Sequence, residues 1–202
     1  MTQTPDSVHP TQIAHVVHLY SRAFVNDPLF TYFLPDPKDR LKKLDYVFEF
    51  IITGGLKYGE VMAMEDSLKS VAVLLPSDKI RMTLQQQIAC GGLKLCLDVG
   101  LGVVHRLSYL HEFTAKLQKR HMPEKHRYLQ LLGVDPEMQG QGYGGRMLHE
   151  IQRRLKVERL PLYLETENEK NLPFYTKRGF KVMEATQLPR TSIPVWALGW
   201  SP

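Results

Sequence analysis

Cysteine is scarce in this sequence: Cys90 and Cys96 are the two among 202 residues. The segment around them is predicted as one helix, in which residues six apart face different sides, so we expect no disulfide between them. They show neither Cys-x-x-Cys nor Cys/His spacing, and no zinc or other metal site is predicted. A reducing, cytoplasmic compartment fits this composition.

Long apolar runs are also missing. The most apolar window, residues 88–104, is interrupted by Lys94 and Asp98 and contains four glycines. A membrane helix needs roughly 20 predominantly apolar residues. Residues 1–10 lack a basic start followed by an apolar run, so no secretion signal is expected. The sequence therefore predicts a protein with no membrane partner.

No charge of one sign dominates. The chain has 26 Lys and Arg against 21 Asp and Glu, a net charge of +5. This modest excess permits anion binding without specifying it. The densest basic stretch, residues 116–127, is followed by one aromatic residue, Tyr128, whereas nucleic-acid sites typically interleave basic and aromatic residues. We predict a solvated helix end there and no nucleic-acid partner.

The remaining composition is that of a globular protein, with 43% hydrophobic and 23% charged residues. A chain of this size buries roughly 70% of the surface that its unfolded form exposes. No repeat and no linker interrupts the sequence. We expect one domain over residues 1–202.

The first half of the chain is predicted to be mainly helical. Apolar residues recur at helical spacing over residues 13–24, and the pattern stops at residues 26–28, Asn-Asp-Pro. Asp36 before Pro37 is typical of a helix start, and apolar residues follow on one broad face up to Ile52. Two helices are expected.

Strands and a glycine-rich helical segment follow. Residues 60–65 and 70–75 are short apolar runs around the polar turn Asp66-Ser67, which predicts an antiparallel hairpin. Residues 81–121 are compatible with helix, but their glycines argue against one unbroken helix. We expect two helices with a bend.

From residue 127 the pattern changes to alternating strands and helices. Its expected elements are a strand at 128–134, a helix after the glycines, a strand at 162–165, a short helix at 172–178 and strands at 181–183 and 195–200. Hairpins together with a crossover helix imply an α/β (α+β) fold: a mixed, mostly antiparallel central sheet flanked by helices on both faces.

The loop before the long helix has four glycines in the six positions 140–145. Free backbone N–H groups at a helix N-terminus, with roughly half a positive charge from the helix dipole, suit a phosphate or pyrophosphate. A Walker loop would continue with Lys and Ser or Thr, whereas Gly145 is followed by Arg146. Gly140, Gly142 and Gly145 fit the Gly-x-Gly-x-x-Gly spacing of a dinucleotide fold, but so late a position in the chain is not typical of that fold.

Two motifs together resemble the GNAT acetyltransferase superfamily. Residues 139–144, Gln-Gly-Gln-Gly-Tyr-Gly, have its Gln/Arg-x-x-Gly-x-Gly/Ala form, and residues 171–180 have its Asn-x-x-Phe-Tyr helix followed by Gly-Phe. Ala-Phe-x-x-Asp-Pro-x-Phe at 23–30 and a strand ending in Leu75-Pro76 are most similar to puromycin-type N-acetyltransferases and their relatives. One departure is that the usual first strand is hard to find in residues 1–10.

The resemblance implies acetyl-CoA as co-substrate. Its pyrophosphate would lie on the backbone amides of the glycine loop, and its pantetheine arm would pair with the strand before the loop. Asn171 would cap its helix or bind the pantetheine or adenine-phosphate part. The cofactor-binding residues implied are Leu132, Gly133, Val134, Gln139, Gly140, Gln141, Gly142, Tyr143, Gly144, Gly145 and Asn171.

The resemblance also suggests catalytic groups. It places Tyr175 beside the sulfur, where a phenol could protonate the departing thiolate; a half-buried core tyrosine is the alternative. Glu165, at the end of a strand, is a candidate base for the amine, although strand alternation could equally turn it away. His105, His111 and His121 lie in the helical segment expected to wall the acceptor site, where surface positions explain them as well. Asp27 and Phe30 are explained by capping and packing or by contact with the acceptor.

The function predicted is therefore N-acetyl transfer from acetyl-CoA to a primary amine of a small molecule by direct attack. One alternative keeps the fold as a non-catalytic acyl-CoA-binding sensor, and another is a dinucleotide-binding oxidoreductase built on the same glycines. The oligomeric state is open, a homodimer included.

Overall fold

The computed structural model describes residues 6–64 and 68–202. Within them, the sheet has the strand order β1-β2-β3-β4-β5-β7-β6. Neighbouring strands are antiparallel except for β4 and β5, which are parallel. The strands are β1 (Asp6–Ser7), β2 (Glu60–Ala63), β3 (Ser70–Pro76), β4 (Arg127–Val134), β5 (Leu162–Thr166), β6 (Lys181–Gln187) and β7 (Pro194–Trp200). The predicted mixed, mostly antiparallel sheet is confirmed.

The helices lie between these strands, in two groups of three in the first part of the chain and singly after β4. They are α1 (Ile13–Phe24), α2 (Pro28–Phe33), α3 (Pro37–Tyr58), α4 (Leu84–Ala89), α5 (Gly92–Val99), α6 (Leu101–His121), α7 (Tyr143–Glu158) and α8 (Leu172–Thr176). Three short 3₁₀ turns are η1 (Pro10–Gln12), η2 (Pro136–Met138) and η3 (Glu169–Asn171). The start of α3 is as expected, because the Asp36 carboxylate accepts a hydrogen bond from the Lys38 N–H at 2.9 Å.

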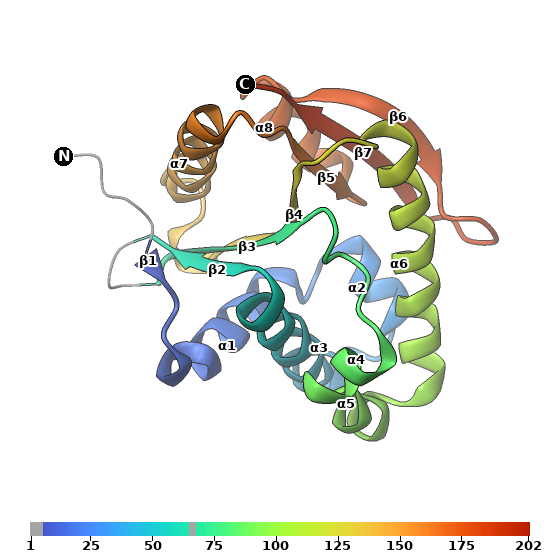
Figure 1. Cartoon of the computed structure of the whole chain (residues 1–202). Helices are drawn as coiled ribbons and strands as arrows, with labels where there is room; N and C mark the ends of the chain where they lie inside the picture. Colours follow the sequence, from blue (N-terminus) through green and yellow to red (C-terminus); the bar gives the residue numbers. More distant parts are fainter. Residues whose placement is uncertain (1–5, 65–67) are drawn as a thin grey trace.

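Strand β3 separates two apolar cores. Val71 and Val73 belong to the core that packs against α1 and α3, while Ala72 and Leu74 belong to the core against α7. This division follows from the two-residue repeat of a strand, whose successive side chains point to opposite faces. Figure 1 shows α1 and α3 on one side of the sheet and α7 on the other. Helices therefore cover both faces, as predicted.

Strands β4 and β5 separate soon after they meet. Their pairing consists of Arg127 with Leu162 and Tyr128 with Tyr163, although β4 continues to Val134. Beyond Tyr128, the edge of β4 that faces β5 has no strand partner, so backbone N–H and C=O groups there are available to a ligand. The sheet is held together on either side of this opening by the β3–β4 and β5–β7 pairs.

The glycine-rich segment forms three helices, so the prediction of two helices with one bend was wrong. Gly91 and Gly100 have φ angles of +91° and +97°, and a left-handed residue ends a helix because L side chains rarely adopt that conformation. Cys90 ends α4 and Cys96 lies within α5, so the two thiols are not on one helix as expected. Both cysteines are free.

Two other short elements differ from expectation. Helix α2 had no strong periodic pattern and was not predicted; Asp27 begins it by accepting the Leu29 N–H at 3.0 Å, with Pro28 in its first turn. Residues 6 and 7 form the first strand, paired with Ala63 and Met62 of β2. The predicted turn Asp66-Ser67 lies outside the described residues.

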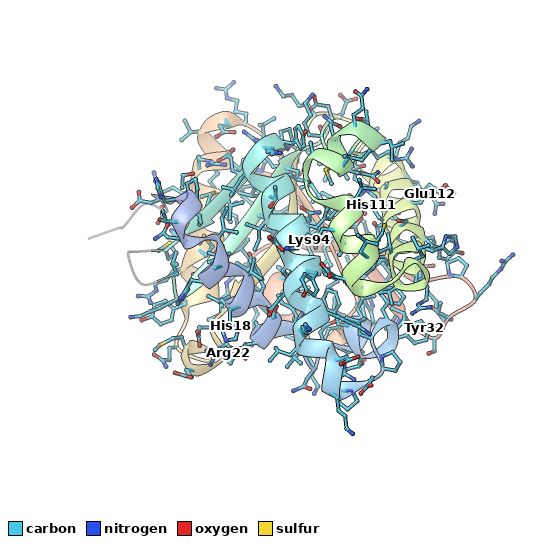
Figure 2. All side chains as sticks on the ribbon, turned by 90° about the horizontal axis from the view of Figure 1, so that it is seen from below. His18, Arg22, Tyr32, Lys94, His111 and Glu112 are labelled. Carbon is cyan, nitrogen blue, oxygen red and sulfur yellow. The ribbon has the colours of Figure 1, made fainter. Side chains whose placement is uncertain are left out.

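The helices on one side of the sheet form a layer of their own. Figure 2 looks onto it, with His18 and Arg22 on α1, Lys94 on α5 and His111 on α6. Lys94 joins α5 to α3 through an ion pair with Glu49, 2.7 Å between Nζ and Oε2. Over the residues that the structure describes, no helix has the length and apolarity to cross a membrane.

Candidate active site

The opening between β4 and β5 leads into a cavity of about 580 Å³. Its walls come from the helical layer (α1 to α6), from β3, β4 and β5, and from α8. A volume of this size suits a small organic ligand. Four of the predicted site residues line it: Leu132, Glu165, Asn171 and Tyr175.

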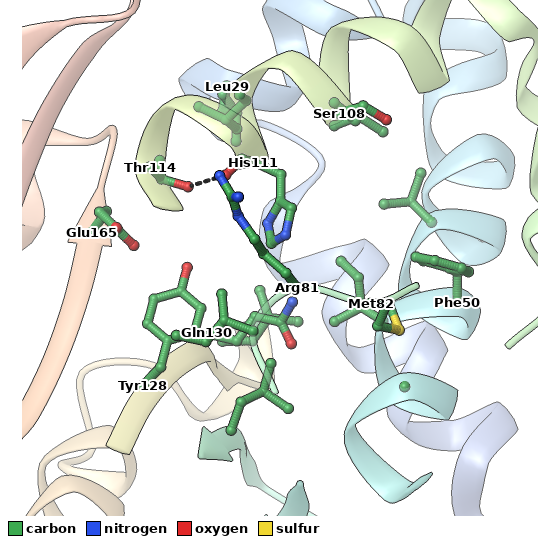
Figure 3. A pocket seen from close by; sticks show the side chains of 18 of the residues that line it. Leu29, Phe50, Arg81, Met82, Ser108, His111, Thr114, Tyr128, Gln130 and Glu165 are labelled. Carbon is green, nitrogen blue, oxygen red and sulfur yellow. Dashed lines mark hydrogen bonds between the residues drawn. The ribbon is translucent and has the colours of Figure 1, made fainter. Parts of the chain in front are cut away.

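Glu165 is among the residues that line this cavity, and both of its carboxylate oxygens are buried. Burial raises the pKa of its carboxyl group to about 8, while the hydroxyls of Tyr128 and Tyr163 lower it in part. In the described part of the chain, neither carboxylate oxygen has a hydrogen-bond partner of good geometry. Figure 3 shows Tyr128 pointing its hydroxyl toward Glu165 across one end of the cavity.

Two further carboxylates lie at the same end. Glu167 lines the cavity two residues beyond Glu165, and burial followed by repulsion from Asp27 raises its pKa to about 7. Asp27 also lines the cavity while it caps α2, and burial raises its pKa. Like charges in one desolvated place disfavour ionisation of all three. Asp27, Glu165 and Glu167 together form the acidic cluster.

Tyr175 sits on α8 with one side packed and the other facing the cavity. Its ring meets Phe174 and Phe180 edge to face, with centroids 5.0 and 5.5 Å apart. Burial, with Glu167 as a smaller cause, raises its pKa above the ordinary value of 10.0. The phenol therefore stays protonated and is available as a donor.

Asn171 lines the cavity but does not cap α8, so the capping expectation was wrong. Its amide Nδ2 donates to Thr166 Oγ1 at 3.0 Å. The cap in this segment is Asn168, whose Oδ1 accepts the Lys170 N–H at 3.2 Å. The contact with Thr166 ties α8 to the end of β5, so Tyr175 and Glu165 are held on adjoining walls.

The glycine loop, residues 139–145, has the form expected of an anion cradle. Gly142 begins α7 with φ +85°, and no side chain caps this helix. A Cβ at Gly140 or Gly142 would meet no atom within 4 Å. The first N–H groups of a helix have no partner within it. The N-terminus of α7 is thus open on the ligand side, and a pyrophosphate fits these residues.

Basic side chains surround this loop. Lys69 Nζ lies 3.0 Å from the Tyr143 hydroxyl, and the Arg146 guanidinium covers the Tyr143 ring at 4.2 Å from its centroid. These two cations lower the pKa of Tyr143. Arg178 lies on the other side, where its guanidinium would meet a Cβ at Gly145 at 2.5 Å. Their positive charge adds to the attraction of the α7 N-terminus for an anion.

The loop is anchored to the rest of the fold from beneath. Arg22 on α1 forms an ion pair with Glu137 at 2.8 Å, and the Gln141 amide donates to the Glu137 carbonyl at 3.1 Å. The Gln139 amide donates to the Val134 carbonyl at 3.3 Å. These contacts fix the loop at the end of β4, outside the cavity itself.

The remaining predicted residues are not among those that line the cavity. Gly133 and Val134 continue β4 toward the loop. A Cβ at Gly133 would approach Tyr20 Cε1 to 2.6 Å, so packing against α1 already requires glycine at this position. The predicted set therefore divides into cavity residues and loop residues, joined by β4.

The three candidate histidines separate in the structure. His111 lines the cavity, and burial together with Arg81 lowers its pKa. His105 is exposed on α6. His121 contacts Glu184, its Nε2 2.5 Å from Oε2, away from the cavity. Only His111 walls the site as expected.

Sequence reasoning missed several polar residues of the cavity. They are Glu167, Tyr128, Arg81 and Thr114. Glu165 and Glu167 are two residues apart at the end of β5. Because alternate side chains of a strand point to the same face, this spacing could have predicted that both lie on one face. Arg81 lies in the connection after β3, where no pattern indicated its direction. Among the described residues, no group of three or more His, Cys, Asp or Glu could hold a metal ion.

Comparison with known proteins agrees with this geometry. Residues 97–182 match the family model for the acetyltransferase (GNAT) domain. This segment runs from α5 to the start of β6 and contains both the glycine loop and Tyr175.

Solved structures share the fold over nearly the whole chain. A protein from Corynebacterium glutamicum described as histone acetyltransferase HPA2 and related acetyltransferase is 19% identical, with a TM-score of 0.69 over 100% of this chain and 97% of that one. The C-terminal condensation domain of Ebony, in complex with beta-alanyl-dopamine, is 8% identical, with a TM-score of 0.74 over 99% of each chain. A Drosophila melanogaster polyamine N-acetyltransferase is 14% identical, with a TM-score of 0.60 over 98% of this chain and 99% of that one.

Three features of the site occur together in this chain: the separating strands β4 and β5, the glycine loop before α7, and the Asn-x-x-Phe-Tyr helix. Residues 97–182 of the same chain match the acetyltransferase (GNAT) domain. The predicted resemblance to the GNAT superfamily is supported over residues 97–182, while the finer similarity to puromycin-type enzymes stays a prediction. The part of the chain that contains the glycine loop and Tyr175 thus matches the GNAT acetyltransferase domain.

Proposed function

We propose that this protein transfers the acetyl group of acetyl-CoA to a primary amine of a small molecule, with residues 1–202 acting as one domain. One observation carries the proposal: Glu165 and Tyr175 face a common cavity beside the unpaired edge of β4, and the same strand leads to the glycine loop. A candidate base (Glu165), a candidate acid (Tyr175) and the glycine loop that suits an anion thus all lie at β4 or at the cavity beside it.

Acetyl-CoA supplies an activated thioester, and the chain's own residues would hold it. The open amides of the glycine loop suit its pyrophosphate, and the free N–H and C=O groups of Leu132, Gly133 and Val134 suit the amides of its pantetheine arm. A backbone N–H of β4 aimed at the thioester carbonyl would stabilise the developing oxyanion.

Two protons must move in this reaction. Glu165 takes one proton from the alkylammonium, and the free amine forms a C–N bond to the acetyl carbon while the C–S bond breaks. The departing thiolate takes a proton from the Tyr175 hydroxyl, and the second proton, which the acylated nitrogen loses, restores that hydroxyl. The pKa of Glu165, about 8, is closer to that of an alkylammonium than an ordinary carboxyl group would be.

The relatives of known fold favour an amine acceptor. Two neighbours are named for amine chemistry: a polyamine N-acetyltransferase, and a condensation domain in complex with beta-alanyl-dopamine. A cavity lined by three carboxyl groups next to Tyr175 is consistent with a cationic acceptor here. The acyl-CoA sensor is less well supported, because a sensor needs neither the acidic cluster nor space for an acceptor.

Thermal unfolding and thiol release test the proposal together. Acetyl-CoA at 100 times its dissociation constant should stabilise the protein by about 2.7 kcal/mol, and NADPH should not. Free CoA thiol should then appear with a panel of primary amines. Stabilisation by NADPH alone would support the dinucleotide alternative, and tight binding without thiol release from any amine would support the sensor.

A further inference from the structure

The cavity is polar at one end and apolar over most of its remaining wall. Figure 3 shows Glu165 and Tyr128 on one side, Phe50 and Met82 on the opposite side, and Arg81 with His111 between them. Apolar side chains from four helices and from the connection before α4 form the larger part of the wall: Leu29, Phe50, Ile51, Met82, Leu95 and Leu107.

Three of the four described carboxyl groups that line the cavity lie at the polar end. The acidic cluster lies beside Tyr175, where its three carboxyl groups have raised pKa values. A fourth lining carboxylate, Glu112, is exposed and pairs with Lys116 at 3.0 Å between Nζ and Oε1. An ammonium group bound beside the acidic cluster would relieve the repulsion among its members.

Positive charge stands further along the cavity. Arg81 and Lys79 both line it. Arg81 is near enough to His111 to lower the pKa of that imidazole. A second ammonium group on the acceptor would therefore meet either these cations or the apolar wall. Either position is unfavourable, since burying an unpaired charge is costly.

We propose that the acceptor is a hydrophobic monoamine: its single ammonium group lies at the acidic cluster, and its apolar body fills the space between Phe50, Met82 and Leu107. This inference rests on the proposed function and names its substrate class. Polyamines are disfavoured because, among the described residues that line the cavity, the one carboxylate outside the acidic cluster is Glu112, which is already paired with Lys116. Short amines are disfavoured because they would leave the apolar wall at Phe50, Met82 and Leu107 uncovered.

Three amines of equal length test the class directly. Octylamine, 1,8-diaminooctane and 8-aminooctanoate share seven methylene groups and differ at the eighth carbon, which is a methyl group, a methylene that carries an ammonium group, and a carboxylate. With the full chain and acetyl-CoA, kcat/KM for octylamine should exceed that of the other two by about tenfold or more, because a charged end loses apolar burial. A preference for the diamine overturns the inference, and a preference for the amino acid would assign Arg81 as a second anchor instead.

A substitution in the apolar wall should reverse this preference. Met82→Glu places a carboxylate opposite the acidic cluster, and the ratio of kcat/KM for the diamine to that for octylamine should rise about tenfold. Met82→Gln is the neutral control of the same size and should move this ratio much less. An equal ratio in the two variants contradicts the inference; if Met82→Glu does not fold, the three-amine comparison on the natural chain still decides.

The outcome also separates this inference from the proposed function. If acetyl-CoA stabilises the protein but octylamine releases no thiol while another amine does, the acceptor class is wrong and acetyl transfer stands. If acetyl-CoA neither stabilises the protein nor releases thiol with any amine, the proposed function fails and the inference fails with it.

Discussion

Among single residues, Glu165 joins two properties that a general base needs. It faces the cavity beside Tyr128, and burial brings its pKa to about 8. A carboxyl group with an ordinary pKa would hold a proton from an alkylammonium only weakly. The structure thus gives a physical reason to prefer Glu165 over His111, whose pKa moves in the opposite direction.

Activity should therefore depend on the ionisation of Glu165. Only the carboxylate accepts a proton, so kcat/KM is expected to rise with pH through about 8 and then level off. Glu165→Gln should remove this rise and lower kcat by roughly 10²- to 10⁴-fold. Steady-state rates from pH 6 to 10 check both points, with the exposed Glu169→Gln as control. A retained rise in Glu165→Gln would assign the base to another group.

Tyr175 should matter for turnover more than for binding. Tyr175→Phe keeps the ring contacts with Phe174 and Phe180 and removes the hydroxyl, so kcat should fall by roughly 10²-fold or more while the dissociation constant of acetyl-CoA changes little. Calorimetry and single-turnover rates measure the two quantities. Unchanged turnover with chemistry rate-limiting would remove Tyr175 from the mechanism.

The sequence predicted the identity of these residues better than their surroundings. Tyr175, Asn171 and Glu165 were found because they belong to or precede a motif. The direction of Glu165 stayed open, because alternation fixes which residues share a face and not which face meets the cavity. Glu167 and Arg81 were missed because their role depends on tertiary neighbours, Asp27 in one case and His111 in the other.

Among the elements, the glycine loop and α7 form the unit that would bind phosphate. Gly142→Asp should raise the dissociation constant of acetyl-CoA by at least tenfold, because it puts a carboxylate where the N-terminus of α7 attracts an anion. Gly142→Asn is the matched control, since it shares the strain of a side chain at φ +85° without the charge. Isothermal titration compares them, and equal affinities in the two variants would contradict the cradle.

Elements with strong patterns were predicted well, and those governed by single residues were not. Helices α1 and α3 and strands β3, β4 and β7 followed from apolar periodicity. Helix α2 is six residues long and depends on the cap by Asp27, which a periodicity argument does not detect. The break between α5 and α6 depends on the left-handed conformation of Gly100, which the sequence permits without requiring.

For the whole molecule, the parallel contact between β4 and β5 organises the site. It lasts for two residue pairs, after which the strands separate while their antiparallel partners hold the sheet on either side. The helical layer closes over the opening and supplies the apolar wall of the cavity. The glycine loop thus lies at one end of β4, and the cavity lies beside the middle of the same strand.

The acidic cluster should also make the free energy of unfolding of the whole protein depend on pH. Burial raises the pKa of Glu165 from 4.5 to about 8 and that of Glu167 to about 7, so between pH 4.5 and 8 the native state binds more protons than the unfolded chain. Its free energy of unfolding should then fall as pH rises through this window. Glu165→Gln cannot ionise, so the fall should be smaller and the variant should be more stable than the natural chain at pH 9. Urea unfolding at pH 5, 7 and 9 measures the difference, with Glu169→Gln as the exposed control; identical pH dependence in all three proteins would show that the cluster is solvated as ordinary carboxylates are.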